Sequence, residues 1–177
     1  SGDYWDTTAL ENAREEIVNA AQQKGECFSR AYRYLSGAAS VVSASKQFCG
    51  NLILKEKLEK CVGRLVSSIK DTGQVGKIIN RRTLAVSMNG AVRVTTFKSA
   101  QTVIAVKECA ATASAFFDLL EKSLLMKGQT IVRSRSPLGG TAELYLPELD
   151  MAFVPYEENV DRQLTYTKII NMQRFVD

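Results

Sequence analysis

Histidine is the residue type that this sequence lacks entirely. Its absence excludes nucleophiles activated by a Ser–His or Cys–His pair, and it excludes metal sites built on imidazole. Chemistry based on carboxylates, lysine or tyrosine stays open, but no two of the C-terminal carboxylates stand out by their spacing as a catalytic pair. We therefore predict that the chain is not an enzyme and that it uses no cofactor and no metal.

Long apolar runs are absent as well. No stretch approaches the roughly 18 residues of a membrane span, and the first residues lack the core of a signal peptide. The chain is therefore predicted to be cytoplasmic. Ser1-Gly2 has the character of an expression scar or a processing end, so the sequence leaves open whether the first residue is native.

Cysteine is scarce and widely spaced. The four residues Cys27, Cys49, Cys61 and Cys109 include no Cys-x-x-Cys pair. Structural zinc sites use close ligand pairs, so a zinc site is not expected. We interpret the four as reduced side chains that pack as small hydrophobic groups. Disulfide formation is the alternative that the spacing leaves open.

The first 70 residues carry apolar positions at helical spacing. We predict helices over residues 8–24, 26–48 and 52–70, separated by Gly25 and by Cys49-Gly50-Asn51. The third has the clearest stripe, and its lysines fall largely off it. Because the connections are short, the three helices are expected to form an antiparallel bundle over residues 8–70.

A hairpin followed by one long helix is predicted for the middle of the chain. Asn89-Gly90 favours a two-residue turn, which would place Val86 opposite Arg93. Seven apolar residues then follow at steps of three and four, which predicts one helix over 99–127: Val103, Val106, Ala110, Ala113, Phe117, Leu120 and Leu124. We interpret this stripe as a core face; a homo-oligomer seam through helix 99–127 is the alternative.

The C-terminal part predicts strands at 129–133, 142–146 and 151–155, the last at a sheet edge because prolines flank it. Residues 159–175 are interpreted as helical. The fold class is thus α+β and mainly helical, with an N-terminal three-helix bundle and a small antiparallel sheet packed on one long helix. We expect a single domain over 1–177, with a subdomain joint near 71–77 between the bundle 8–70 and the segment 78–177.

Positive charge is concentrated in the middle of the chain. Residues 53–107 hold eleven basic and three acidic residues, a net charge of +8 against +4 for the whole chain. Such a gradient can concentrate an anionic partner, or it can simply be a solvated face. The polyanion-binding candidates are Lys70, Lys77, Arg81, Arg82 and Arg93.

Two short motifs have features of phosphate sites. Gly73-x-x-Gly76-Lys77 lacks the four intervening residues and the Ser or Thr of a P-loop. A Gly-x-x-Gly loop between helices, as in KH RNA-binding domains, matches the spacing, but only Lys77–Asn80 could form the second helix. Arg133-Ser-Arg-Ser-Pro137 is interpreted as a strand end and a turn, with a phosphorylated loop as the alternative.

The function predicted first is a non-enzymatic protein-interaction, scaffold or accessory module, with Tyr4 and Trp5 as candidate contact residues. The alternative is binding of RNA, another nucleic acid or another polyanion by the basic segment 53–107. A second alternative is an enzyme that uses carboxylate or lysine chemistry.

Overall fold

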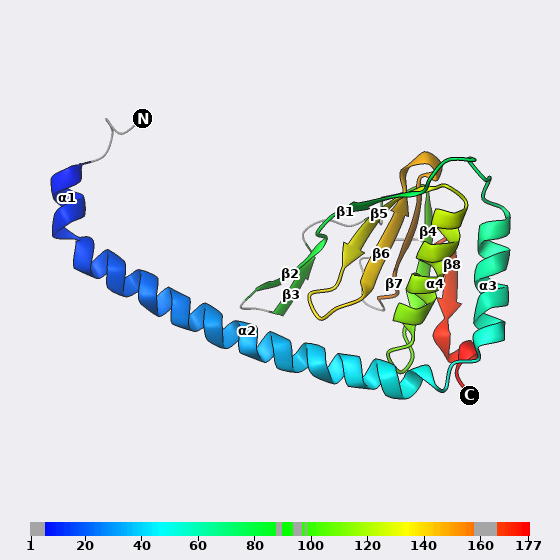
Figure 1. Cartoon of the computed structure of the whole chain (residues 1–177), viewed down its shortest axis with the longest axis horizontal. Helices are drawn as coiled ribbons and strands as arrows, with labels where there is room; N and C mark the ends of the chain where they lie inside the picture. The colour runs from blue at the N-terminus through cyan, green and yellow to red at the C-terminus, as the bar shows by residue number, and fades with distance from the viewer. Residues whose placement is uncertain (1–5, 88–89, 94–96, 98, 158–165) are drawn as a thin grey trace. The chain divides into compact units, whose positions relative to one another are not determined.

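The computed structural model describes residues 6–87, 90–93, 97, 99–157 and 166–177 (Figure 1). The candidate contact residues Tyr4 and Trp5 lie outside this part of the chain. The chain divides into two compact units, Ser1–Ala38 and Ala39–Asp177. Each unit is described by itself. Among the described residues, no helix combines the length and the apolar character needed to cross a membrane.

The first unit holds helix α1 (Thr7–Asn12) and most of helix α2 (Arg14–Gly50). Asp6 begins α1, because its carboxylate accepts a hydrogen bond of 3.0 Å from the amide of Ala9. Neither helix contains a buried residue. The prediction of two helices separated at Gly25 is wrong, since α2 continues through that glycine, and the three-helix bundle is not confirmed.

The second unit is an α+β structure with a mixed sheet. Helices α3 (Lys55–Ser67) and α4 (Ala113–Met126) accompany six strands in the order β1-β5-β6-β7-β4-β8. The strands are β1 (Lys77–Asn80), β4 (Thr102–Lys107), β5 (Thr130–Arg135), β6 (Thr141–Leu146), β7 (Met151–Pro155) and β8 (Lys168–Asn171). A separate pair joins β2 (Leu84–Ser87) to β3 (Gly90–Arg93), and two short 3-10 helices are η1 (Pro147–Leu149) and η2 (Met172–Phe175).

The main core lies between the sheet and the two helices, which run side by side along it (Figure 1). Leu58, Val62 and Val66 of α3 face this core. From α4, Phe117, Leu120 and Leu124 do the same, so the prediction that this stripe faces a core is confirmed. A smaller apolar cluster covers the other face of the sheet: Phe97, Val103, Val132, Ala152 and Val154.

The prediction of one helix over 99–127 is wrong in its first half. Residues 102–107 form β4, which pairs in parallel with β7 and with β8. Val103 contacts the smaller cluster while Ile104 and Val106 contact the main core, so the strand is buried on both faces. A strand of this kind is apolar throughout and therefore also matches helical spacing. The chain then turns at Ala110 and Ala111, which have positive φ values of 51° and 60°.

The small antiparallel sheet is replaced by a mixed one. β1 pairs with β5 in parallel, whereas β5–β6 and β6–β7 are antiparallel. The predicted strands at 129–133, 142–146 and 151–155 are confirmed, but β7 lies inside the sheet rather than at its edge. Where the tail was interpreted as helical, its described residues form β8 and η2.

The β2–β3 hairpin is confirmed as an antiparallel pair, but its register differs from the prediction. Val86 pairs with Ala91 instead of Arg93. The turn residue Asn89 lies outside the described residues.

The Gly73-x-x-Gly76 loop leads into a strand, since Lys77–Asn80 is β1. Its neighbour Thr72 donates hydrogen bonds from its amide to the carbonyl of Lys127 and from its hydroxyl to that of Gly128. A Cβ atom on Gly76 would lie 2.6 Å from the carbonyl oxygen of Leu125. The two-helix context of a KH loop is therefore missing, and the loop packs on the end of α4. Residues 71–77 lie within the second unit, and the single-domain arrangement stays a prediction.

Candidate polyanion-binding site

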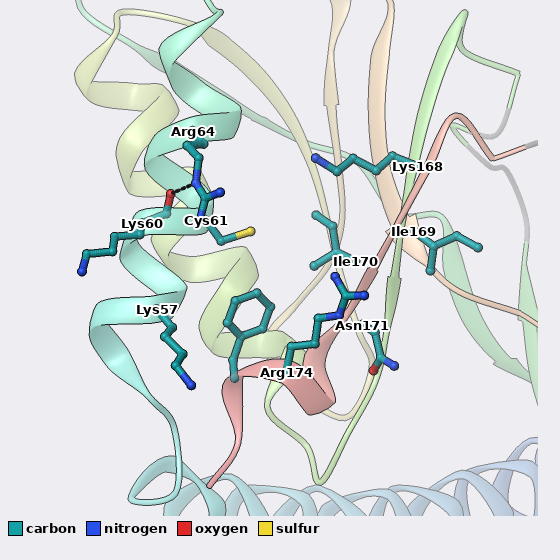
Figure 2. Close-up of a pocket in the computed structure, with 10 residues that line it drawn as sticks. Lys57, Lys60, Cys61, Arg64, Lys168, Ile169, Ile170, Asn171 and Arg174 are labelled. Carbon is teal, nitrogen blue, oxygen red and sulfur yellow. Dashed lines mark hydrogen bonds between the residues drawn. The ribbon is translucent and has the colours of Figure 1, made fainter.

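A row of cations follows one side of α3. Lys57, Lys60 and Arg64 follow one another at steps of three and four residues, so they share one helix face, while Leu58 and Val62 point into the core. The Arg64 Nε donates to the carbonyl of Lys60 at 3.2 Å, which directs the guanidinium along the helix (Figure 2). The helix thus carries an external basic stripe about 10 Å long.

The C-terminal residues supply the facing side. β8 pairs with β4 in the register Ile104 to Lys168, and buried Ile170 anchors it to the core. Asn171 then begins η2, since its side chain accepts a hydrogen bond of 3.0 Å from the amide of Gln173. The Lys168 side chain points toward α3, and Arg174 extends from η2 toward Asn171; both line the space next to α3 (Figure 2).

Backbone contacts hold the two sides together. The amide of Leu54 donates to the carbonyl of Phe175 at 2.8 Å, and the amide of Asp177 donates to the carbonyl of Leu52 at 3.0 Å. Ile53 and Val176 form an antiparallel bridge. The end of the chain is therefore fastened beside the start of α3.

We call the space between α3, β8 and η2 the basic groove (Figure 2). It has a volume of about 400 Å³ and ten lining residues: Lys57, Lys60, Cys61, Arg64, Lys168, Ile169, Ile170, Asn171, Arg174 and Phe175. Five of these are cationic and none is acidic. Within the described chain, no ion pair joins any of the five to a carboxylate. A groove lined by one sign of charge concentrates ions of the opposite sign.

A second group of cations lies at the opposite edge of the sheet. Arg81 and Arg82 follow β1, and Arg133 and Arg135 belong to β5. With Asn80 they surround a cavity of about 560 Å³, which we call the arginine cavity.

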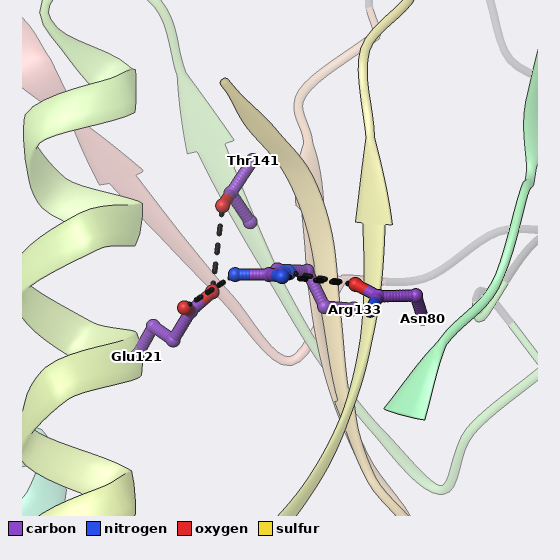
Figure 3. Close-up of polar contacts among 4 residues, drawn as sticks. All are labelled: Asn80, Glu121, Arg133 and Thr141. Carbon is purple, nitrogen blue, oxygen red and sulfur yellow. Dashed lines mark hydrogen bonds and ion pairs between the residues drawn. The ribbon is translucent and has the colours of Figure 1, made fainter. Parts of the chain in front are cut away.

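Arg133 is engaged within the fold (Figure 3). Its guanidinium forms an ion pair of 2.7 Å with Glu121 of α4 and donates twice to the side-chain oxygen of Asn80, at 3.1 and 2.9 Å. Thr141 donates to the second Glu121 oxygen at 3.4 Å. The ion pair with Glu121 neutralises the charge of Arg133. No carboxylate pairs with Arg81, Arg82 or Arg135 among the described residues.

The five polyanion candidates named from the sequence are only partly brought together. Arg81 and Arg82 line the arginine cavity. Lys70 and Lys77 line neither of the two basic cavities. Arg93 ends β3, and its side chain is outside the described part of the structure.

Sequence reasoning missed the basic groove as a unit. The spacing of Lys57, Lys60 and Arg64 was a usable signal for a basic helix face. Nothing in the sequence placed Lys168 and Arg174 opposite that face, because the parallel pairing of β8 with β4 joins distant segments. The same holds for Arg133 and Arg135, which the β1–β5 pairing brings beside Arg81 and Arg82.

The first unit offers an apolar surface instead. Ile17, Val18, Phe28, Tyr32 and Tyr34 are 49 to 80% exposed. The rings of Phe28 and Tyr32 stack at 6.4 Å, and the Lys24 ammonium lies 5.9 Å from the Phe28 ring. Among residues 6–38 no second layer covers these side chains, and a uniformly polar surface would be expected on a helix with no partner.

One ionisable group is perturbed by a defined contact. Tyr145 donates its hydroxyl to Asp150 at 3.0 Å, and this hydrogen bond, together with desolvation and the Asp150 charge, raises the pKa of Tyr145 above 10.0. The contact keeps the phenol protonated, which suits a hydrogen-bond donor and not a base. The described residues hold no group of three His, Cys, Asp or Glu side chains suited to a metal ion.

Comparisons of the chain with family models, with curated proteins and with solved structures find no match.

Proposed function

We propose that this protein binds the phosphate backbone of a single-stranded nucleic acid in the basic groove. The observation that supports the proposal is that five cationic residues, from three elements, are among the residues that line a groove without a lining carboxylate. Contacts of lysine and arginine with phosphates supply most of the sequence-independent affinity for nucleic acids. The groove suits one strand because positively charged grooves that follow a single backbone are the common way to hold unpaired strands.

Binding of a labelled single-stranded RNA of about 20 nucleotides, followed by fluorescence anisotropy, tests this proposal. Affinity should fall steeply between about 50 and 200 mM salt, with a log–log slope of about 0.7 for each phosphate neutralised. The triple variant Lys57→Gln, Arg64→Gln, Lys168→Gln should bind more weakly and lose about two units of slope.

A matched control removes three charges elsewhere in the same unit. Lys55, Lys70 and Lys122 are exposed and do not line the groove. Changing all three to Gln lowers the net charge by the same three units as the groove variant, and it should leave most of the affinity for RNA. Equal losses in both triple variants would show a general charge effect, and no binding at the lowest salt would remove the proposal.

We also propose that α2 provides a protein-contact surface, which keeps the protein-interaction function beside nucleic-acid binding. The supporting observation is the exposure of large apolar side chains in the first unit. A photoreactive phenylalanine analogue in place of Phe28 tests it in an extract of cells that produce the chain. Adducts at this position, and not at a Lys55 control, are expected; no adduct at either position would contradict the proposal.

A further inference from the structure

Six positions of α2, including the exposed Ile17 and Phe28, follow a heptad spacing. Starting at Ile17, the positions 21, 24, 28, 31 and 35 follow at steps of four and three: Ala21, Lys24, Phe28, Ala31 and Leu35. Such positions form one seam along a helix. Tyr32 and Tyr34, with Val18, lie next to this seam and widen its apolar face.

The seam needs a partner for physical reasons. Helices in proteins are stabilised mostly by packing of an apolar face and much less by intrinsic propensity. α2 contains Gly25, Gly37 and several serines, which lower its propensity further. The Lys24 side chain does not prevent packing, since its stem can lie along the seam while its ammonium stays near the Phe28 ring.

The spacing of the seam is symmetric about Gln22 and Gln23. Two antiparallel copies can therefore be aligned so that Ile17 of one faces Phe28 of the other and Ala21 faces Lys24. In this register the numbers of two facing residues always sum to 45. Each contact then occurs twice, as in a two-fold symmetric interface. Beside the seam, the same register places bulky Val18 near Gly25 of the other copy, and Ala20 near Cys27.

The charge distribution favours this direction. Residues 11–16 carry a net charge of −2 (Glu11, Arg14, Glu15 and Glu16), whereas residues 24–33 carry +2 (Lys24, Glu26, Arg30 and Arg33). An antiparallel pair brings the acidic end of each copy over the basic part of the other, within the roughly 10 Å range of unscreened charges. A parallel pair in register would instead place like charges together.

We propose that the partner of α2 is a second copy of this chain, paired antiparallel through residues 14–31. This inference rests on the proposal that α2 is a protein-contact surface, and it is independent of nucleic-acid binding. The predicted alternative, a homo-oligomer seam through residues 99–127, is less suitable because the apolar stripe of α4 is buried in the core.

Sedimentation of the full chain over a range of concentrations is the first test. We expect a monomer–dimer equilibrium that Ile17→Lys weakens about a hundredfold, because a symmetric pair loses two buried isoleucines at once. Asn19→Lys adds the same charge on the opposite helix face and should have little effect. A monomer at every concentration, or equal effects of both variants, would overturn the proposal.

Cross-linking tests the register. In Ala20→Cys, the new thiol should form a disulfide with native Cys27 of the second copy, giving a covalent dimer on mild oxidation. Residues 20 and 27 of one helix are about 10 Å apart along its axis, too far for an internal disulfide. The dimer should disappear in Ala20→Cys with Cys27→Ser. Its absence from Ala20→Cys, or a Cys27-dependent dimer in the parent chain, would rule out this register.

Failure can be assigned to the correct proposal. If the purified chain is monomeric while the Phe28 photoadduct has the mass of a different protein, self-pairing is wrong and the protein-contact proposal stands. If neither a dimer nor an adduct forms, both are wrong.

Discussion

At the scale of single residues, Tyr145 joins two parts of the second unit. Its ring stacks on Phe97 with centroids 5.1 Å apart, and its hydroxyl donates to Asp150. Asp150 has a left-handed backbone with φ 44°, and its other carboxylate oxygen accepts from the amide of Gln101 at 3.0 Å. One carboxylate therefore connects the turn after η1 to the start of β4.

The raised pKa of Tyr145 predicts a pH dependence of stability. A group whose pKa is higher in the folded state stabilises the fold fully below its unfolded pKa of about 10 and loses that contribution as pH rises through the folded pKa. Tyr145→Phe should therefore lower the melting temperature slightly at neutral pH and reduce its decline in alkali. Thermal unfolding at several pH values measures this. An identical alkaline decline in parent and variant would contradict it.

The Arg133–Glu121 ion pair leads to a second prediction. Both side chains are largely buried, at 13 and 15% exposure, so Arg133→Met would leave a carboxylate with little solvent. We expect a loss of about 2 kcal/mol in unfolding free energy. Arg135→Met, at the exposed end of the same strand, should cost less than about 0.5 kcal/mol. Denaturant unfolding of both variants checks the difference, and equal losses would show that the ion pair is not responsible.

At the scale of elements, two glycines with similar backbones offer a matched comparison. Gly73 and Gly128 have φ values of +67° and +70°. A Cβ on Gly73 would meet nothing within 4 Å, whereas one on Gly128 would lie 2.3 Å from the Thr72 hydroxyl and 2.4 Å from the Gln74 carbonyl. Both positions disfavour a side chain through φ, but only Gly128 adds a collision.

Gly73→Ala should therefore cost about 1 kcal/mol, the typical penalty for a left-handed alanine. Gly128→Ala should cost at least about 2 kcal/mol more, because the loop before β1 must move away from the end of α4. Denaturant unfolding measures both. Similar losses would mean that the close approach of this loop does not contribute to stability.

Elements with one buried face and one more exposed face were predictable from the sequence. The α4 stripe, the α3 stripe and the strands β5 and β6 all followed from spacing. The region 99–112 was not, because a strand buried on both faces shows no alternation of apolar and polar residues. Its β-branched Val103, Ile104 and Val106 were the neglected signal. Lys24-Gly25 resembles a helix end in the sequence, but α2 continues through both residues.

At the scale of the whole molecule, the candidate site depends on pairing between distant segments. Net charge located the basic middle of the chain, and helical spacing could have located the α3 face of the groove. The facing side could not be predicted, since it required β8 to pair with β4 across more than sixty residues. Side chains assembled by long-range pairing leave no local pattern.

Phe175 allows the architecture of the groove to be tested without removing any cation. Its ring is 8% exposed and packs in the main core, so Phe175→Ala should cost about 3 kcal/mol and loosen η2 beside Arg174. RNA affinity should fall as well. Ile169→Ala, which trims a half-exposed side chain of the same groove, should change stability by less than about 1 kcal/mol. Unchanged RNA affinity in Phe175→Ala would show that η2 does not position the site.

The two outermost strands of the sheet carry the same four residues, Lys-Ile-Ile-Asn, in β1 and in β8. In β1 the second isoleucine is the exposed one, at 51%, whereas in β8 it is the first, at 50%. Among the described residues each of these strands pairs with one neighbouring strand only, and each has an exposed isoleucine at its edge of the sheet. Such an edge favours pairing with strands of other molecules. A lysine at each rim opposes such polymerisation by keeping like charges and bound water there. Solubility of this protein at high concentration should accordingly depend on Lys77 and Lys168 staying charged, and acylation of these amines would favour fibre-like aggregates.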